Sequence, residues 1–195
     1  MSVHQPDKKE LRTMLHQRRT AISDAAREAA TRAVASRFLL EVPRAKGQVV
    51  AGYWPFRAEV DVRPLLQALI GEEYTVALPF IEGKAVPLTF RSWRPETPMV
   101  EGMHGILAPD PAHSDIVLPD IVITPLLGFD EKGNRLGYGA GDYDRTFTAL
   151  SGKKRFLAVG VAFEPQKLEE IPVEPYDYQL DMVVTEKRLY VFERP

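Results

Sequence analysis

"DIVITPLLGF" (residues 120–129) is a continuous apolar run, and "RLGYGAGDYDR" (residues 135–145) follows it with three glycines at alternate positions. A short, unbroken run rich in β-branched residues is typical of a strand that is buried on both faces. After the glycines, the sequence predicts a helix that begins near Asp142. A buried strand that leads through a loop into a helix is the repeating unit of an α/β protein, so this stretch sets the fold class.

The same alternation extends in both directions along the chain. Four further apolar runs predict strands: "QVVAGYW" (48–54), "YTVALPF" (74–80), "RFLAVGVAF" (155–163) and "DMVVT" (181–185). Helical patterns predict helices at 7–20, from Ser23 to 40, at 61–70 and at 144–154, with Asp7 and Ser23 as N-caps. We therefore expect one domain over residues 1–195, with a largely parallel sheet and helices on both of its faces.

Residues 81–119 interrupt this alternation. Within them, "KAVPLTFRSW" (84–93) predicts an edge strand or a hairpin, and the remainder is dense in proline and glycine. We expect an ordered excursion from the sheet. A functional loop and a structural covering of the sheet are both open explanations for it.

Composition excludes several classes of site. The chain contains no cysteine, which excludes disulfides, thiolate zinc sites and cysteine nucleophiles. "MSVHQPDKKE" (1–10) has no apolar signal core, and no run of about 18 apolar residues occurs, so we expect a cytoplasmic protein without a membrane partner. Residues 1–46 carry ten Lys and Arg against five Asp and Glu, which suits either an anion-binding helix or a solvated basic face.

The glycine block can be explained as a phosphate-binding loop or as a flexible turn. Glycines 137, 139 and 141 leave room for close approach of a phosphate at the start of a helix. Arg135 and Arg145 supply charged donors on either side. The spacing matches neither the Walker pattern nor the dinucleotide-binding fingerprint, and glycine count alone leaves the two explanations open.

Carboxylates near the block indicate a candidate metal site. Asp144 has the position that a magnesium site shared with substrate phosphates needs, although a first-turn carboxylate also stabilises a helix without any metal. Asp177 or Asp181, at the start of the last predicted strand, would complete such a site or serve as a turn residue.

An aromatic segment follows the first predicted strand, where Tyr53, Trp54 and Phe56 stand ahead of Glu59. Aromatic surfaces with one carboxylate suit a flat heterocycle that is stacked and hydrogen-bonded at the same time. The other explanation is a set of core residues with a glutamate that caps the next helix.

Taken in order, these segments resemble the 5-formyltetrahydrofolate cyclo-ligase family, also called methenyltetrahydrofolate synthetases. The resemblance is carried by "KKELRTMLHQRR" (8–19), "GYWPFRAEVDVRPLL" (52–66), "TPLLGFDEKGNRLGYGAGDYDR" (124–145), "VGVAFEPQ" (159–166) and "IPVEPYDYQLDMVVTE" (171–186). The glycine block together with the terminal "VVTE" is its most specific part.

The resemblance implies an ATP-dependent ring closure of 5-formyltetrahydrofolate to 5,10-methenyltetrahydrofolate, with release of ADP and phosphate and with Mg2+ required. The implied chemistry is phosphorylation of the formyl oxygen, which makes that oxygen a leaving group. The implied fold is a three-layer α/β/α arrangement related to sugar-phosphate isomerases and CoA transferases. We expect small-molecule substrates, no nucleic-acid partner and a monomer.

The resemblance also assigns residues by position. The expected ATP contacts are Lys8, Arg12, Arg135, Leu136, Gly137, Tyr138, Gly139, Ala140, Gly141, Asp142 and Tyr143. The expected folate contacts are Trp54, Glu59, Tyr138, Gly139, Ala140, Gly141 and Asp142. Tyr143 and Arg145 are the candidate catalytic residues, and Asp144 and Asp177 are the candidate magnesium ligands.

Three positions depart from the family pattern. Ala140 replaces a frequent glycine, Asp142 stands at a usually aromatic position, and Tyr176 stands where a histidine often precedes the aspartate. The first two departures motivate an alternative function, a non-catalytic regulator of the same fold that binds a nucleotide or a phosphosugar.

Overall fold

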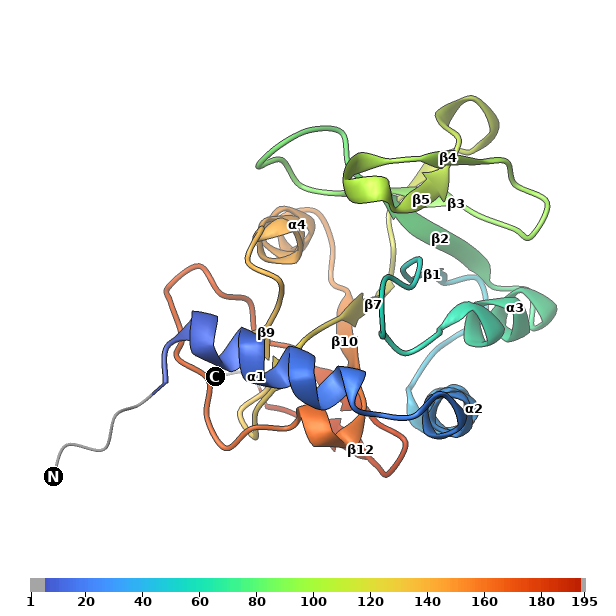
Figure 1. The fold of residues 1–195 in the computed structure, drawn as a ribbon. Coiled ribbons are helices and arrows are strands. Elements are labelled where there is room, and N and C mark those ends of the chain that lie inside the picture. Colours follow the sequence, from blue (N-terminus) through green and yellow to red (C-terminus); the bar gives the residue numbers. More distant parts are fainter. Residues whose placement is uncertain (1–5, 194–195) are drawn as a thin grey trace, which may run out of the picture.

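An eight-stranded sheet forms the centre of the computed structural model, which describes residues 6–193 (Figure 1). Its strand order is β12-β11-β10-β7-β1-β2-β3-β6. The strands are β1 (Val49–Ala51), β2 (Thr75–Phe80), β3 (Thr89–Ser92), β6 (Ile116–Val117), β7 (Ile121–Pro125), β10 (Leu157–Val161), β11 (Met182–Val184) and β12 (Leu189–Val191). Pairing is parallel from β11 to β2 and antiparallel at both edges. The single domain predicted over residues 1–195 extends at both ends beyond the described residues.

Helices pack against both faces of this sheet. α2 (Asp24–Glu41) and α3 (Arg63–Gly71) cover one face, where Phe38 and Leu66 share a core with Val50 of β1. α4 (Asp142–Ser151) covers the other face, where Phe147 packs with Ala51. Successive strand residues therefore point into two different cores, which explains why the strands are apolar throughout. The predicted α/β class with a mostly parallel sheet is confirmed.

α1 (Lys8–Thr20) lies across the end of the sheet and not on one of its faces (Figure 1). The Asp7 carboxylate caps its first turn, and the Glu10 side chain accepts from the Asp7 backbone N–H in return. Its buried residues Leu11 and Leu15 pack against Leu127 and Leu136. α1 is thereby fixed beside the segment that contains the glycine block. None of the helices within residues 6–193 combines the length and the apolar character that crossing a bilayer requires.

The run at 120–129 is not one strand, and this part of the prediction is wrong. β7 ends at Pro125, and β8 (Gly128–Phe129) turns away to pair with β9 (Arg135–Leu136). The buried Gln166 amide donates to the carbonyls of Leu126 and Leu127, which satisfies the backbone groups that leave the sheet. The fully buried carboxylate of Asp130 closes the β8–β9 turn through the backbone N–H groups of residues 132 and 134.

The excursion at 81–119 contains β3 and β6 and a separate hairpin. β3 pairs with β2 as a hairpin, which confirms one alternative of the prediction for residues 84–93. The other alternative is wrong, because β6 pairs with the outer side of β3, which is therefore not an edge strand. β4 (Met99–Glu101) and β5 (Leu107–Pro109) form the separate hairpin, joined by the short turn η1 (Met103–Gly105). Two further 3-10 turns are η2 (Pro111–His113) and η3 (Glu164–Gln166).

Gly160→Ala is expected to lower the free energy of unfolding by about 1–3 kcal/mol. A Cβ at Gly160, in the middle of β10, would lie 2.7 Å from side-chain carbons of both Leu126 and Leu180. Gly71→Ala is the matched control, because nothing lies within 4 Å of its Cβ position at the end of α3. Urea unfolding of both variants tests this, and equal stability would show that the core around β10 yields easily.

Candidate functional site

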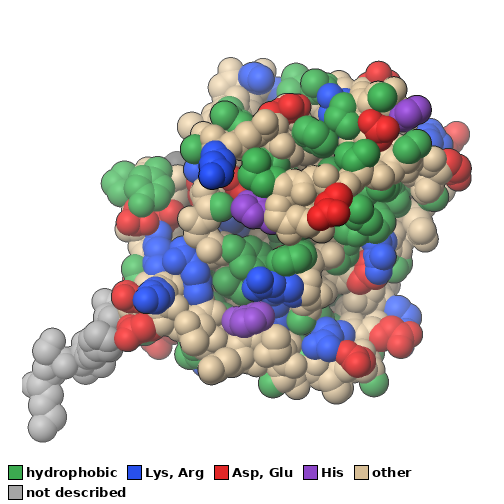
Figure 2. Space-filling view, turned by 45° about the horizontal axis from the view of Figure 1, so that its top comes forward, with side chains coloured by type: hydrophobic (Ala, Val, Ile, Leu, Met, Phe, Trp, Pro, Cys, Tyr) green, Lys and Arg blue, Asp and Glu red, His purple; other side chains and the backbone are tan. Residues whose placement is uncertain are grey.

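A cavity of about 760 Å³ opens where β1, β2 and β7 end. Tyr53 enters it after β1, Ile81 after β2, and Pro125 at the end of β7. β2 and β7 lie on opposite sides of β1, so the strand order reverses at this point. Ligands of open α/β sheets bind at such a reversal. Figure 2 shows the hollow lined by hydrophobic side chains, with Lys and Arg side chains gathered beside it.

The glycine block forms one wall of the cavity. Gly139 and Gly141 have positive φ angles of 104° and 71°, which most side chains disfavour, and Gly141 is the N-cap of α4. Arg12 Nε donates to the Gly137 carbonyl at 2.9 Å, which ties the loop to α1. Ala140 is not among the residues with positive φ, so the departure from glycine there creates no backbone strain.

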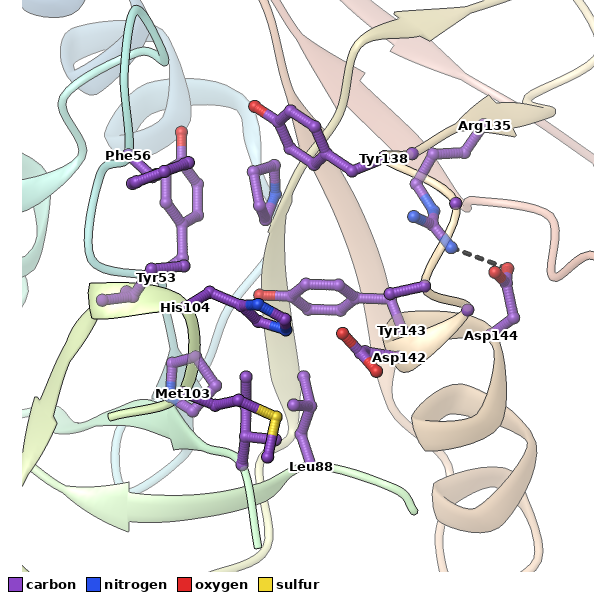
Figure 3. Close-up of a pocket in the computed structure, with 18 of the residues that line it drawn as sticks. Tyr53, Phe56, Leu88, Met103, His104, Arg135, Tyr138, Asp142, Tyr143 and Asp144 are labelled. Carbon is purple, nitrogen blue, oxygen red and sulfur yellow. Dashed lines mark hydrogen bonds and ion pairs between the residues drawn. The ribbon is translucent and has the colours of Figure 1, made fainter. Parts of the chain in front are cut away.

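Acidic and basic side chains alternate at one end of the cavity. Lys8 Nζ donates to Asp177 Oδ2 at 2.6 Å and to Glu174 Oε2 at 2.7 Å. Burial opposes the charge of Lys8, but these two carboxylates outweigh it and raise its pKa. Arg135 Nη2 donates to Asp144 Oδ1 at 2.6 Å, the bond drawn in Figure 3. The charges at this end are therefore paired and held in place.

These carboxylates fit a magnesium ion that arrives with phosphates. Asp144 and Asp177 both line the cavity, as the metal prediction requires. No cluster of three acidic or histidine side chains within residues 6–193 forms a complete protein cage for a metal. Mg2+ in nucleotide sites is held by one or two carboxylates together with phosphate oxygens and water, so two carboxylates suffice for that mode of binding.

The other end of the cavity combines aromatic rings with Glu59. Trp54 and Phe56 are half-buried there, whereas Tyr53 is 2% exposed and belongs to the core. Glu59 Oε1 accepts from the Tyr138 hydroxyl at 2.6 Å, and Oε2 accepts from the Phe56 backbone N–H at 2.8 Å. Burial raises the pKa of Glu59, and the two hydrogen bonds oppose that rise. Glu59 does not cap α3, whose N-cap is formed without a side-chain bond.

The two candidate catalytic residues have different surroundings. Tyr143 lines the cavity, and burial followed by the charge of Glu59 raises its pKa far above the usual value, so its hydroxyl remains a donor. Arg145 lies outside the lining and donates from Nη2 to the Ala140 carbonyl and to Asp142 Oδ1, both at 2.7 Å. Its contacts stabilise the loop from behind and balance the charge of Asp142.

Every other residue predicted for substrates or metal lines this one cavity. Figure 3 shows how three parts of the chain meet around it: Tyr53 and Phe56 from the loop after β1, Tyr138 from the glycine block with Tyr143 from the first turn of α4, and His104 from the β4–β5 hairpin. The model for the 5-formyltetrahydrofolate cyclo-ligase family matches residues 4–186. The chain belongs to this family.

Named relatives cover nearly the whole chain. The 5-formyltetrahydrofolate cyclo-ligases of Escherichia coli and Haemophilus influenzae are 34% and 33% identical to it and cover 91% and 89% of it, with 99% and 94% of their own lengths. The solved structure of Aquifex aeolicus 5,10-methenyltetrahydrofolate synthetase has a TM-score of 0.80 at 30% identity and covers 96% of this chain and 94% of its own. Membership of this enzyme family, predicted from the motifs, is confirmed.

Two parts of this candidate site were missed by sequence reasoning. The β4–β5 hairpin contributes Met103, His104 and Leu107 to the cavity, so the excursion at 81–119 forms a wall of the site. The positive φ of His104 (64°) turns the chain there, and no local pattern marks it. Arg19 is the second, because its guanidinium is buried and bonds to Tyr138. Arg19 stands four residues after Leu15 and therefore on the same apolar stripe of α1, and this spacing could have predicted its burial.

Proposed function

We propose that the protein converts 5-formyltetrahydrofolate and ATP into 5,10-methenyltetrahydrofolate, ADP and phosphate. The observation that supports this most strongly is that a single cavity has two chemically different ends. One end has aromatic rings and Glu59, and the other has Lys8, Arg135 and the carboxylates of Asp144 and Asp177. The glycine block lies between them.

The aromatic end suits the pteridine ring of the folate. A flat, polar heterocycle gains contact area from Trp54 and Phe56, which line this end. Both oxygens of Glu59 already accept one hydrogen bond, and each carboxylate oxygen accepts two. The remaining acceptor positions are available to N–H groups of the ring. A carboxylate in a water-poor site recognises such donors strongly.

The charged end suits the phosphates of ATP. Lys8, Arg12 and Arg135 bring three positive side chains to the lining, close to the glycine loop and the start of α4. Backbone N–H groups at a helix start attract anions. Asp144 and Asp177 would hold Mg2+, which neutralises charge on the phosphates when bound. The residues of this end thus position the phosphates, and they need no protein nucleophile.

The chemistry needs only positioning and charge stabilisation. The formyl oxygen attacks the γ-phosphorus, and the bond from that phosphorus to the bridging oxygen of ADP breaks. The neighbouring anilino nitrogen then bonds to the formyl carbon and loses its proton. Phosphate leaves with the former formyl oxygen, and the carbon now bridges both nitrogens. The Tyr143 hydroxyl, held protonated, is a suitable donor to oxygens that become negative.

The test is turnover by the purified protein. We expect the strongly ultraviolet-absorbing methenyl product from 5-formyltetrahydrofolate when ATP and Mg2+ are both present, with one ADP released for each product. Omission of either one abolishes the signal. Absence of product under every condition contradicts the proposal, and tight ADP or phosphosugar binding without turnover, measured by calorimetry, would favour the non-catalytic regulator instead.

Lys8→Ala is expected to raise the KM for ATP about tenfold, the effect of losing one charge-assisted contact, and to change the KM for the folate less than twofold. The loss also leaves Asp177 and Glu174 without their cation, beside the expected phosphates. Steady-state kinetics with each substrate varied in turn measures this.

Lys9→Ala is the matched control, because Lys9 is the exposed neighbour on the same helix turn. We expect both KM values of this control to equal those of the wild type. A larger effect of Lys8→Ala on the folate KM than on the ATP KM would mean that the two ends of the cavity have been assigned to the wrong substrates.

A further inference from the structure

Arg19 has a buried charge that packing alone does not explain. Its side chain is 1% exposed on the last turn of α1, and Nη2 donates to the Tyr138 hydroxyl at 2.7 Å. Among the described residues, Nε and Nη1 have no hydrogen-bond partner, and no carboxylate lies within ion-pair distance of the guanidinium. Burial of a cation with so few partners is costly, so the residue needs a compensating role.

The hydrogen-bond directions connect Arg19 to the cavity. A guanidinium only donates, so the Tyr138 hydroxyl accepts from Arg19, and its own proton is directed to Glu59 Oε1. The other oxygen of Glu59 accepts from the Phe56 N–H. Both oxygens thus accept a hydrogen bond, an arrangement that suits the ionised carboxylate. Arg19 is therefore linked to Glu59 in the cavity by one hydroxyl group, that of Tyr138.

We propose that Arg19 is a positioning residue that acts through Tyr138: the guanidinium orients the tyrosine hydroxyl, and the hydroxyl holds Glu59 as an ionised acceptor for N–H groups of the substrate ring. The inference rests on the proposed function and names the determinant of its folate affinity. Tyr138 extends from the glycine loop toward the loop that carries Tyr53 and Phe56 (Figure 3). The hydrogen bonds from Arg19 to Tyr138 and from Tyr138 to Glu59 thus connect α1, the glycine block and the loop after β1.

The charges around Glu59 support a direct role for Arg19. Burial raises the pKa of Glu59, and the hydrogen bonds from Tyr138 and Phe56 and then the charges of Arg19 and Arg57 lower it. The titratable and charged groups that act on Glu59, or on which its charge acts, come from every neighbouring element: Arg19 on α1, Tyr53 after β1, Arg57 on its own loop, Tyr138 on the glycine loop and Tyr143 on α4. Without Arg19, less opposes the effect of burial, and the pKa of Glu59 is expected to rise further.

Arg19→Met is the first test, with Arg18→Met as the matched control because Arg18 is its exposed neighbour. We expect Arg19→Met to raise the KM for the folate about tenfold, equivalent to one hydrogen bond to a charged group, and to change the KM for ATP less than twofold. The acidic limb of the kcat/KM profile for the folate moves to higher pH. Arg19→Lys restores part of the affinity, since it returns one charged donor.

Thermal unfolding separates positioning from a structural role. Methionine is apolar and continues the buried stripe of Leu11 and Leu15, which offsets the loss of a positive charge near the buried Glu59, so Arg19→Met is expected to change the Tm little while it weakens folate binding. A lowered Tm with both KM values raised together, and with the pH profile unmoved, would overturn the proposal. A variant with kinetics equal to those of Arg18→Met would overturn it as well.

A titration of the free protein needs no turnover. The Glu59 carboxyl carbon is followed by NMR in protein with 13C-labelled glutamate, and Glu59→Gln assigns its signal. We expect the midpoint to move to higher pH in Arg19→Met and not in Arg18→Met. An unmoved midpoint overturns the role of Arg19 whatever the activity is, whereas wild-type protein without methenyl product rejects only the proposed function.

Discussion

Asp144→Asn is expected to lower kcat about 100-fold or more, because under the proposed function it removes a carboxylate that would hold Mg2+, the cation that would neutralise and position the transferring phosphoryl group. Asparagine keeps the size of the side chain and one carbonyl oxygen. That oxygen still accepts from Arg135 Nη2 and from the Tyr178 backbone N–H, the two donors to Asp144 Oδ1. The start of α4 therefore keeps its hydrogen bonds, and the loss falls on the chemistry.

The measurement is turnover at a series of Mg2+ concentrations. We expect the variant to need about ten times more Mg2+ for half-maximal activity, as loss of one carboxylate ligand implies. Asp24→Asn is the matched control, because Asp24 is also in the first turn of a helix and is exposed. It changes stability by about 0.3–1 kcal/mol and leaves turnover unchanged. Near-normal activity of Asp144→Asn at limiting Mg2+ would mean that Asp144 only stabilises the start of α4.

The elements that sequence reasoning predicted correctly depend on local patterns. Apolar runs gave the parallel strands because both faces of the sheet are covered, so that Val50 and Ala51 are each buried in a different core. The starts of α1 and α2 were predicted from Asp7 and Ser23, whose caps act within one turn. The residues that the family resemblance assigned to substrates and metal also line one cavity, because the segments that contain them come together in the fold.

The features that sequence reasoning missed depend on partners far along the chain. The strand at 120–129 breaks because Gln166, from a later turn, bonds to the carbonyls of Leu126 and Leu127. The β4–β5 hairpin reaches the site only through tertiary packing. Arg19 is one of the ten basic residues within residues 1–46, and its burial depends on the packing of α1 beside the glycine block.

Glu59→Gln is expected to lower kcat/KM for the folate about 100-fold, because the buried carboxylate that we propose as the acceptor for the substrate ring is replaced by a neutral group with an N–H donor in one position. The kcat/KM for ATP changes far less, since Glu59 lies at the aromatic end of the cavity. Glu28→Gln, on the exposed side of α2, is the matched control. Equal loss for both substrates would indicate a general collapse of the site.

The stability of the same variant has a pH dependence of known sign. Burial raises the pKa of Glu59 in the folded protein above its ordinary 4.5, so its protonated form is stabilising below pH 4.5 and that contribution is lost as the pH rises through the folded pKa. Glutamine cannot ionise and does not lose it. The free energy of unfolding of Glu59→Gln, relative to the wild type, therefore increases from pH 4.5 upward until the wild-type carboxyl is fully ionised. If the amide makes one hydrogen bond fewer than the carboxylate, the difference in the free energy of unfolding changes by the same amount at every pH. Urea unfolding of both proteins across this range measures the difference, and a difference that falls with pH would show that Glu59 is stabilised, not strained, as an anion.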